Sequence, residues 1–257
     1  MVKYGEIYAL GNHRLMCGDA TNLKDVVHLL GTDHVDLILT DPPYGMKVQD
    51  KHGRIGHGEN RGMTGAKDER FANTQLSSKP YPMMKGDKSQ NTAKQHYEIV
   101  KDLTDKLIIW GGNYFANFLP VSGGWIFWDK LTGKNDFSDG ELAWCSCGKR
   151  IRKYTQMWNG VFMQCNYCLN GRGATRGSKA RLHPTQKPVE LHMKILEDFT
   201  KPGDVILDCF GGSGTTLIAC NETGRKCLMM EISPDYCDII IDRYEKLMSE
   251  KAEKVRM

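Results

Sequence analysis

The feature that most constrains this chain is a short apolar run followed directly by a glycine-rich turn. Val205-Ile206-Leu207-Asp208 is typical of a buried strand, and Phe210-Gly211-Gly212-Ser213-Gly214-Thr215-Thr216 follows one residue later. The apolar residues after the turn predict a helix over residues 215–223. In α/β proteins, a strand, a turn whose glycines let the backbone approach a ligand, and a helix N-terminus together bind nucleotide-like molecules. The chain is therefore expected to fold around a mostly parallel sheet.

The spacing within this turn excludes two common phosphate-binding motifs. No lysine follows the last glycine, as a P-loop requires, and Leu217 stands where a dinucleotide fingerprint has its third glycine. An acidic residue, Glu231, ends the next apolar run, and a carboxylate at that position can accept hydrogen bonds from both hydroxyls of a ribose. The amides at the start of the helix would face an anionic group of the same ligand.

Along the rest of the chain, apolar runs alternate with helical segments, which favours an α/β fold with parallel strands. Ser233 is expected to cap the last helix, with Pro234 in its first turn. We expect a single domain over residues 1–257. The predicted strands span residues 14–17, 36–40, 107–110, 125–128, 142–145, 160–163, 205–207 and 227–230. The predicted helices span residues 22–30, 95–106, 188–200, 215–223 and 234–249.

Length and charge narrow the class of protein further. A chain of 257 residues suits one large domain, and a net charge of +4, from 35 basic and 31 acidic residues, is compatible with nucleic acid without indicating it. No apolar run approaches the length of a membrane span, and the N-terminus has no signal-peptide stretch. We therefore expect a cytoplasmic protein with no membrane partner.

The nine cysteines favour reduced thiols, since disulfides are rare in intracellular proteins. Four of them form a C-x-C pair, Cys145 and Cys147, and a C-x2-C pair, Cys165 and Cys168, which is compatible with a four-sulfur zinc site. Cys145, however, continues the apolar segment 142–144, as a core thiol would. We expect no metal, and zinc at these four cysteines is the alternative.

Two segments break the alternation of strands and helices and carry a surplus of positive charge. Residues 46–94 hold ten Lys or Arg against five acidic residues, and residues 169–182 hold four Lys or Arg and no acidic residue. Both follow predicted strands, so we expect them to leave the carboxyl edge of the sheet as loops. Their low apolar content predicts little order of their own.

A second motif, Asp41-Pro42-Pro43-Tyr44, ends the apolar run at residues 36–40. The prolines fix the backbone and remove two amide donors. The Asp41 carboxylate and the Pro42 carbonyl could then accept the two N–H groups of an amine on a planar ring, which would leave the nitrogen lone pair free to attack. Tyr44 offers an aromatic face on which an extruded base can stack. Beside a nucleotide-binding turn, this motif indicates chemistry at the amine of a base.

The two motifs, in this order, resemble those of the DNA amino-methyltransferases, in the subgroup where D-P-P-Y precedes F-x-G-x-G. The resemblance covers nearly the whole chain. It implies a Rossmann-like, seven-stranded, mostly parallel sheet with helices on both faces and its halves permuted in sequence. It also implies S-adenosylmethionine as cofactor and double-stranded DNA as partner. The supporting motifs are Gly18-Asp19-Ala20, Trp110-Gly111-Gly112-Asn113, Trp128-Asp129-Lys130 and His183-Pro184-Thr185-Gln186-Lys187-Pro188.

The resemblance also implies roles for particular residues. Asp41, Pro42, Pro43 and Tyr44 would form the catalytic motif that holds and activates the target base. The residues implied for cofactor binding are Asp19 and Ala20 near the adenine, Glu231 at the ribose, Thr185 and Lys187 at the carboxylate, and Asp41, Asp208, Phe210, Gly211, Gly212, Ser213, Gly214 and Thr215 along the methionine part. In the two basic segments, the residues expected to contact DNA are Arg54, Arg61, Arg172, Arg176, Lys179 and Arg181.

The implied reaction is direct methyl transfer to N6 of a flipped adenine in DNA. Methylation at C5 of cytosine is excluded by the absence of a Pro-Cys dipeptide. Cytosine N4 is the nearest alternative, although family members acting on it more often carry Ser in place of Asp41. Structured RNA, a protein glutamine side chain, and a DNA-binding protein without catalysis remain open. The recognised sequence, a homodimeric state and a restriction partner also remain open. The chain lacks the long target-recognition region that larger family members carry before His183, so the place where it would read the DNA sequence is open as well.

Overall fold

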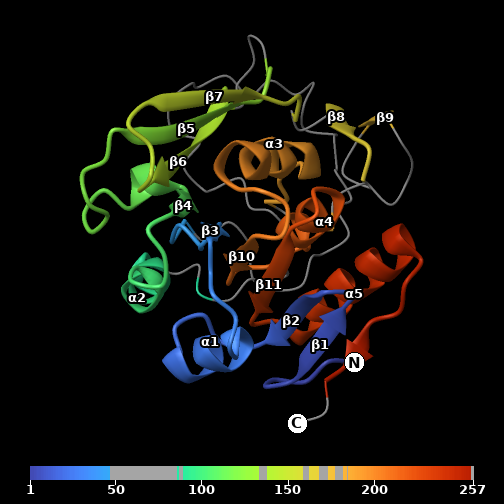
Figure 1. The fold of residues 1–257 in the computed structure, drawn as a ribbon. Helices are drawn as coiled ribbons and strands as arrows, with labels where there is room; N and C mark the ends of the chain where they lie inside the picture. Colours follow the sequence, from blue (N-terminus) through green and yellow to red (C-terminus); the bar gives the residue numbers. More distant parts are fainter. Residues whose placement is uncertain are drawn as a thin grey trace, which may run out of the picture.

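The computed structural model describes residues 1–46, 86, 89–132, 138–158, 162–167, 173–176, 182–183 and 185–255, with the backbone alone for 162–165 and 173–176. Ten strands of the described chain form one sheet in the order β12-β1-β2-β11-β10-β3-β4-β6-β5-β7 (Figure 1). Their bounds are β1 (Ile7–Leu10), β2 (His13–Cys17), β3 (Leu37–Thr40), β4 (Leu107–Trp110), β5 (Gly124–Asp129), β6 (Gly140–Cys145), β7 (Ile151–Thr155), β10 (Val205–Asp208), β11 (Lys226–Glu231) and β12 (Glu253–Lys254).

The middle of the sheet confirms the expected α/β architecture. Strands β2, β11, β10, β3 and β4 are all parallel, and β6 runs antiparallel between β4 and β5. Their side chains are almost wholly buried, as in a parallel sheet covered on both faces. Although β10 and β11 come late in the chain, they pair between β2 and β3.

The sheet is wider than the seven strands expected. β1 and β12 extend one edge and β7 extends the other. β7 and β12 lack the continuous apolar run that marks a central strand: β7 buries only Tyr154, and both residues of β12 are exposed. Hydrogen bonding to a neighbouring strand, rather than burial, holds these two. β1 does carry an apolar run, with Ile7 and Leu10 buried, which sequence reasoning missed.

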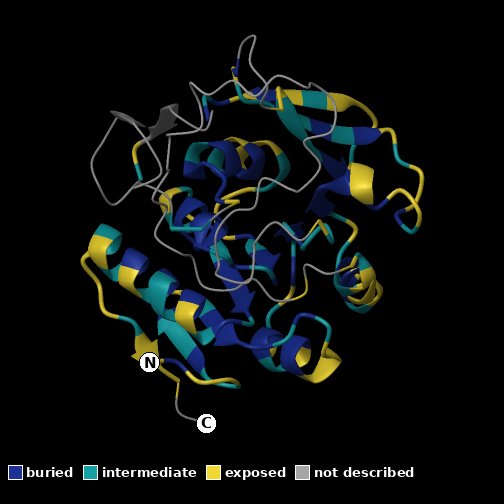
Figure 2. Ribbon diagram, turned by 180° about the vertical axis from the view of Figure 1, so that it is seen from behind, coloured by how far each residue is buried: buried dark blue, intermediate teal, exposed yellow. Residues whose placement is uncertain are grey.

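Helices cover both faces of the sheet, as expected. The helices are α1 (Leu23–Leu30), α2 (Asn91–Val100), α3 (Val189–Phe199), α4 (Thr215–Glu222) and α5 (Pro234–Met248), with a short 3-10 turn η2 (Gly112–Tyr114). One apolar core joins α3, α4 and α5 to the sheet, and a second core joins α1 and α2 to its other face (Figure 1). In Figure 2 the central strands are buried, and exposed residues lie on the outer faces of helices, in loops and on the edge strands. None of the helices in the described residues has the length and apolar character needed to cross a bilayer.

Four local expectations need correction. The helix predicted at 95–106 is α2, which begins at Asn91, inside the segment 46–94, and ends at Val100, because Leu103 and Thr104 bond to other backbone groups. The segment 169–182 is not all loop, because β9 (Gly173–Arg176) pairs with β8 (Phe162–Cys165), two residues beyond the strand predicted at 160–163. The tail 250–257, which its charged composition predicts to fray, contains β12, which pairs with β1. Ser233 takes the N-cap position of α5 without a capping hydrogen bond from its side chain.

Candidate active site

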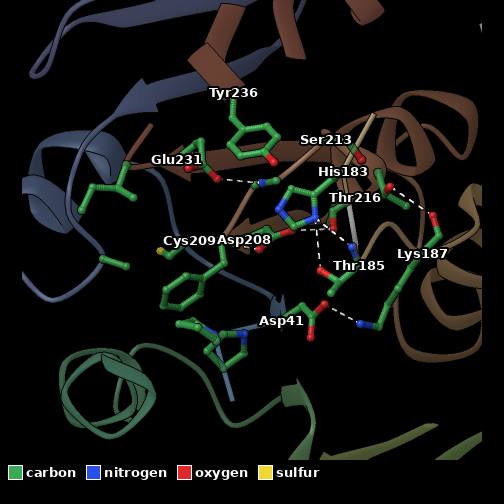
Figure 3. A pocket seen from close by; sticks show the side chains of 18 of the residues that line it. Asp41, His183, Thr185, Lys187, Asp208, Cys209, Ser213, Thr216, Glu231 and Tyr236 are labelled. Atoms are coloured by element: carbon green, nitrogen blue, oxygen red, sulfur yellow. Dashed lines mark hydrogen bonds and ion pairs between the residues drawn. The ribbon is translucent and has the colours of Figure 1, made fainter. Parts of the chain in front are cut away.

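A pocket with about 1160 Å³ of space, its open mouth included, lies where β3, β10 and β11 end (Figure 3). It brings together both sequence motifs, which lie more than 160 residues apart in the chain. Of the residues predicted for catalysis and cofactor binding, those that line it are Asp19, Ala20, Asp41, Pro42, Pro43, Tyr44, Thr185, Lys187, Asp208, Phe210, Gly211, Gly212, Ser213, Thr215 and Glu231.

The glycine-rich turn has the backbone that its sequence predicts. Gly212 and Gly214 adopt left-handed φ angles of 53° and 79°, which residues with a Cβ rarely adopt. Gly214 does not line the pocket; a Cβ there would come within 3.1 Å of Ile240 on α5. The turn thus needs glycine both for its conformation and for the close approach of α5.

The Asp208 carboxylate is a structural anchor of this turn. It accepts hydrogen bonds from the Thr40 hydroxyl (2.9 Å), the Phe210 amide (3.1 Å) and the Thr216 hydroxyl (2.6 Å). Burial raises the pKa of Asp208 to about 7, although these three donors oppose the rise. With three protein donors on its two oxygens, this side chain ties β3, β10 and α4 together at the pocket.

Glu231 lies toward one end of the pocket, away from Asp41 (Figure 3). It is 8% exposed, and its two oxygens accept the amides of Gly212 (2.8 Å) and Ser233 (2.9 Å). These bonds fix the orientation of the carboxylate. A carboxylate has about four acceptor sites, so two backbone bonds leave it able to accept hydroxyl groups of a ligand.

Asp41 follows β3 and is already bonded within the protein. The Tyr44 hydroxyl donates to its Oδ1 (2.6 Å), and the Lys187 ammonium pairs with its Oδ2. Burial, with the negative charges of Asp41 and Glu141, raises the pKa of Tyr44 well above its ordinary value, so this residue remains a phenol and a donor.

The Tyr44 ring is packed rather than open on all sides. It stacks on Tyr114 at 5.0 Å between centroids and meets Phe115 edge-on at 5.9 Å. A Cβ on Gly111 would lie 2.2 Å from the Tyr44 ring, so the Trp110-Gly111-Gly112-Asn113 motif needs glycine at this position for packing. The sequence did not indicate this contact.

Lys187 differs from its expected environment. The resemblance implies a contact with the cofactor carboxylate from a helix start, but α3 begins two residues later and the Lys187 side chain is only 5% exposed. Its Nζ pairs with Asp41 and lies 3.3 Å from Glu141 Oε2 and 4.9 Å from the centroid of the Trp110 ring. The Thr215 hydroxyl donates to the Lys187 carbonyl (3.2 Å), which joins this segment to α4.

Several residues at the pocket were not singled out from the sequence. His192 on α3 places its Nδ1 3.1 Å from the Thr216 hydroxyl, and burial lowers the pKa of His192 to about 3. The His183 ring packs on Tyr236 of α5 at 4.7 Å. His183, Gln186 and Thr216 carried a sequence signal, their place in a motif. The additional residues that line the pocket are Met46, Thr92, His183, Gln186, His192, Cys209, Thr216, Ile232 and Tyr236.

Most residues expected to contact DNA lie outside the described residues. This applies to Arg54, Arg61, Arg172, Lys179 and Arg181, while Arg176 is described by its backbone alone in β9. The ends of the two basic segments are described nevertheless. Met46 and Thr92 of the first segment line the pocket, as does His183, the residue that follows the second.

The question of a zinc site concerns cysteines that are only partly described. The Cys145 and Cys147 sulfurs lie 3.2 Å apart, whereas two sulfurs on one tetrahedral zinc at 2.3 Å would be separated by about 3.8 Å. The Cys165 side chain and all of Cys168 fall outside the description. Within the described part, His, Cys, Asp and Glu form no group of three that could hold a metal ion.

The strand order, the helices on both faces and the pocket at the carboxyl edge define an α/β protein with a ligand site at the ends of its strands. The DNA methylase family model named N6_N4_Mtase matches residues 35–242, and the chain belongs to this family. It is accordingly a DNA methyltransferase, and its cofactor is S-adenosylmethionine.

Individual relatives are distant but cover most of the chain. The putative methylase YubD of Escherichia coli K12 is 25% identical over 82% of this chain and 84% of its own. The type II methyltransferase M.HpaI of Haemophilus parainfluenzae is 24% identical over 91% of this chain and 74% of its own. Among solved structures, the PvuII DNA methyltransferase, described as cytosine-N4-specific, matches with a TM-score of 0.54 at 15% identity, over 97% of this chain and 98% of its own. At 15% identity, this likeness shows a shared fold alone.

Proposed function

We propose that this chain transfers a methyl group from S-adenosylmethionine to N6 of adenine in double-stranded DNA. The observation that carries the proposal is the shared pocket of Asp41 and the glycine-rich turn. An acceptor for an amine and a turn suited to a nucleotide-like cofactor border the same space. A methyl donor and a base amine could therefore meet there without a covalent enzyme intermediate.

The pocket has the donors and acceptors that S-adenosylmethionine requires. The Glu231 carboxylate, oriented by two backbone amides, would accept the ribose hydroxyls. Asp19 and Ala20 would border the adenine, and the amides at the start of α4, near Ser213 and Thr215, would face the carboxylate. The remaining turn residues, Asp208, Phe210, Gly211, Gly212 and Gly214, would shape the methionine part, with Thr185 and Lys187 at its carboxylate end.

Asp41, Pro42, Pro43 and Tyr44 would act on the target base. The Asp41 carboxylate and the Pro42 carbonyl would accept its two amine hydrogens, so that the nitrogen lone pair faces the methyl group. Bound S-adenosylmethionine supplies that methyl from a sulfonium. The Tyr44 hydroxyl, already bonded to Asp41, would hold the carboxylate in orientation. The face of the Tyr44 ring turned away from Tyr114 would stack on the base.

The two basic segments would clamp the duplex within a single domain of residues 1–257. The support for this is that Met46, Thr92 and His183, at or next to the ends of these segments, line the pocket. A flipped base requires phosphate contacts around it. The side chains proposed for these contacts are Arg54, Arg61, Arg172, Arg176, Lys179 and Arg181.

The choice of adenine rests on Asp41, since the resemblance associates Ser at this position more often with cytosine N4. The test uses tritiated S-adenosylmethionine with duplex DNA, structured RNA and protein as separate acceptors, followed by mass spectrometry of the digested nucleosides. N6-methyladenine from DNA is the expected product. If the product is N4-methylcytosine, the target base is cytosine rather than adenine. Label in RNA or in protein would assign the enzyme to a different class of substrate. DNA binding without any label would indicate a catalytically inactive protein.

A further inference from the structure

A chain of alternating charges leads from Asp41 into the sheet. Lys187 Nζ pairs with Asp41 Oδ2 and lies 3.3 Å from Glu141 Oε2, while Glu141 Oε1 accepts Lys130 Nζ at 2.5 Å. Figure 3 shows Lys187 reaching Asp41 across the lower side of the pocket. From the pocket inward, acidic and basic side chains therefore alternate, in the order Asp41, Lys187, Glu141 and Lys130.

The sheet itself places this chain. Glu141 on β6 is the cross-strand partner of Trp128 on β5, and Lys130 follows directly after β5. Lys130 Nζ lies 4.8 Å from the centroid of the Trp128 ring, and Lys187 Nζ lies 4.9 Å from that of Trp110. Each ammonium thus rests on an indole face, and Glu141 bridges the two.

The surroundings of Lys187 and Glu141 favour the ionised form of each. Burial acts to lower the pKa of Lys187, but Asp41 and Glu141 together raise it above its ordinary value. Burial acts to raise the pKa of Glu141, but Lys187 and Lys130 together lower it below its ordinary value. A buried ammonium shared by two carboxylates neutralises each of them only in part.

We propose that Glu141 is a positioning residue of the methyltransferase, which draws part of the Lys187 charge away from Asp41 and so keeps Asp41 a strong acceptor for the target amine. The proposal rests on the proposed function, in which Asp41 accepts an amine hydrogen. Without Glu141, Lys187 would pair with Asp41 alone, and the carboxylate would become a weaker acceptor. Without Lys130, Glu141 would attract the Lys187 ammonium more strongly, and the Asp41 carboxylate would become a stronger hydrogen-bond acceptor.

Other titratable groups face this cluster and do not change between the variants. His183 and His192 both interact with the Lys187 charge, and the pKa of each is lowered to about 3, chiefly by burial, so they are neutral above that pH. The groups that interact with Asp41 itself are Tyr44 after β3, Asp208 on β10 and Lys187 before α3.

The test compares Glu141→Gln and Lys130→Met, with Asp242→Asn in the exposed Asp242–Lys246 pair of α5 as the matched control. The measurements are kcat and KM for duplex DNA between pH 5 and 9 at saturating S-adenosylmethionine, cofactor affinity by calorimetry, and melting temperature. Glu141→Gln is expected to lower kcat roughly tenfold at little change in KM, because Asp41 becomes a weaker acceptor in the transition state. Lys130→Met is expected to raise kcat, again at little change in KM.

Opposite changes in kcat are what a merely structural role would not produce. If both variants change kcat in the same direction, or leave it unchanged while the melting temperature falls, the role proposed for Glu141 is wrong. Asp41→Ala, which removes the acceptor oxygens, separates this outcome from failure of the proposed function. An inactive Asp41→Ala supports the use of Asp41 as acceptor, whereas an active one overturns both the proposed function and the role of Glu141.

Discussion

Asp41 shows how far the behaviour of one side chain depends on residues remote in sequence. The D-P-P-Y motif predicts a carboxylate poised for an amine, but its two oxygens are engaged by Tyr44, three residues away, and by Lys187, 146 residues away. The remaining lone pairs are those available to a substrate. The acceptor strength of Asp41 is therefore a property of this cluster rather than of the motif alone.

Replacing Asp41 with Ala is expected to lower kcat for DNA methylation by about 100–1000-fold, because one well-placed transition-state acceptor is lost. Cofactor affinity should change little, since Glu231 and the glycine-rich turn remain intact. Single-turnover kinetics and calorimetry measure the two effects, with Asp102→Ala on the exposed surface as control. Retention of more than about a tenth of wild-type kcat would contradict the assigned role.

Glu231→Gln is expected to weaken binding of S-adenosylmethionine by roughly 1.5–3 kcal/mol, the range for hydrogen bonds to a charged group. The chemical step should be nearly unchanged at saturating cofactor. Calorimetry gives the affinity, and a melting curve without cofactor reports any loss of the bonds from Gly212 and Ser233. Unchanged affinity in a variant that melts normally would exclude a ribose contact at Glu231.

At the scale of elements, local signals place the central strands and most helix ends well. β4 coincides with its predicted range, and α3 and α4 begin and end within a residue of theirs. The misplacements are α2 and the hairpin β8–β9. The buried residues of α2, Ala93, His96, Tyr97 and Val100, have helical spacing, so its early start was readable from the sequence. The hairpin lies in polar, glycine-rich sequence, and strand pairing, a long-range property, determines its boundaries.

Replacing Arg172, Arg176 and Arg181 together with Ala is expected to weaken duplex binding and to reduce the slope of log affinity against log salt by up to about 3, since each phosphate contact contributes about 0.9. Cofactor affinity should be unaffected. Titrations of labelled duplex at several salt concentrations measure the slope. A triple variant of exposed lysines outside the basic segments, Lys201, Lys246 and Lys251, serves as control. An unchanged slope would place the DNA contacts elsewhere.

At the scale of the whole molecule, helices cover both faces of the sheet, and several ionisable side chains are buried between the helices and the sheet. Burial lowers the pKa of His96 to about 4 and that of His192 to about 3, while it raises the pKa of Asp208 to about 7. Both histidines pack beside the sheet, His96 edge-on to Phe210 and His192 stacked on Trp110. The fold therefore binds fewer protons at the histidines, and more at Asp208, than the unfolded chain does.

The free energy of unfolding is expected to fall as pH decreases from 7 to 5. The two histidines have lowered pKa values, so the stability they contribute is present above their unfolded pKa of about 6.5 and is lost below it, at up to about 1.4 kcal/mol per pH unit each. Asp208 has a raised pKa, so its contribution to stability changes with pH in the opposite direction. This single contribution is smaller than the combined contribution of His96 and His192. Urea denaturation at pH 5, 6 and 7 tests this, and a His96→Gln/His192→Gln variant should reduce the slope. A stability that is constant or rises toward pH 5 would contradict it.

Sequence alone determined the α/β class, the central strands, the left-handed glycines of the turn and the two motifs that meet at the pocket. These follow from local properties: apolar runs, turn chemistry and helix starts. Tertiary structure alone decided the edge strands β7 and β12, the packing of Tyr44 against Gly111 and Tyr114, and the charge chain from Asp41 through Lys187 to Glu141 and Lys130. The physical reason is that edge pairing and buried ion pairs depend on which distant segments the sheet brings together, and no local pattern encodes that choice.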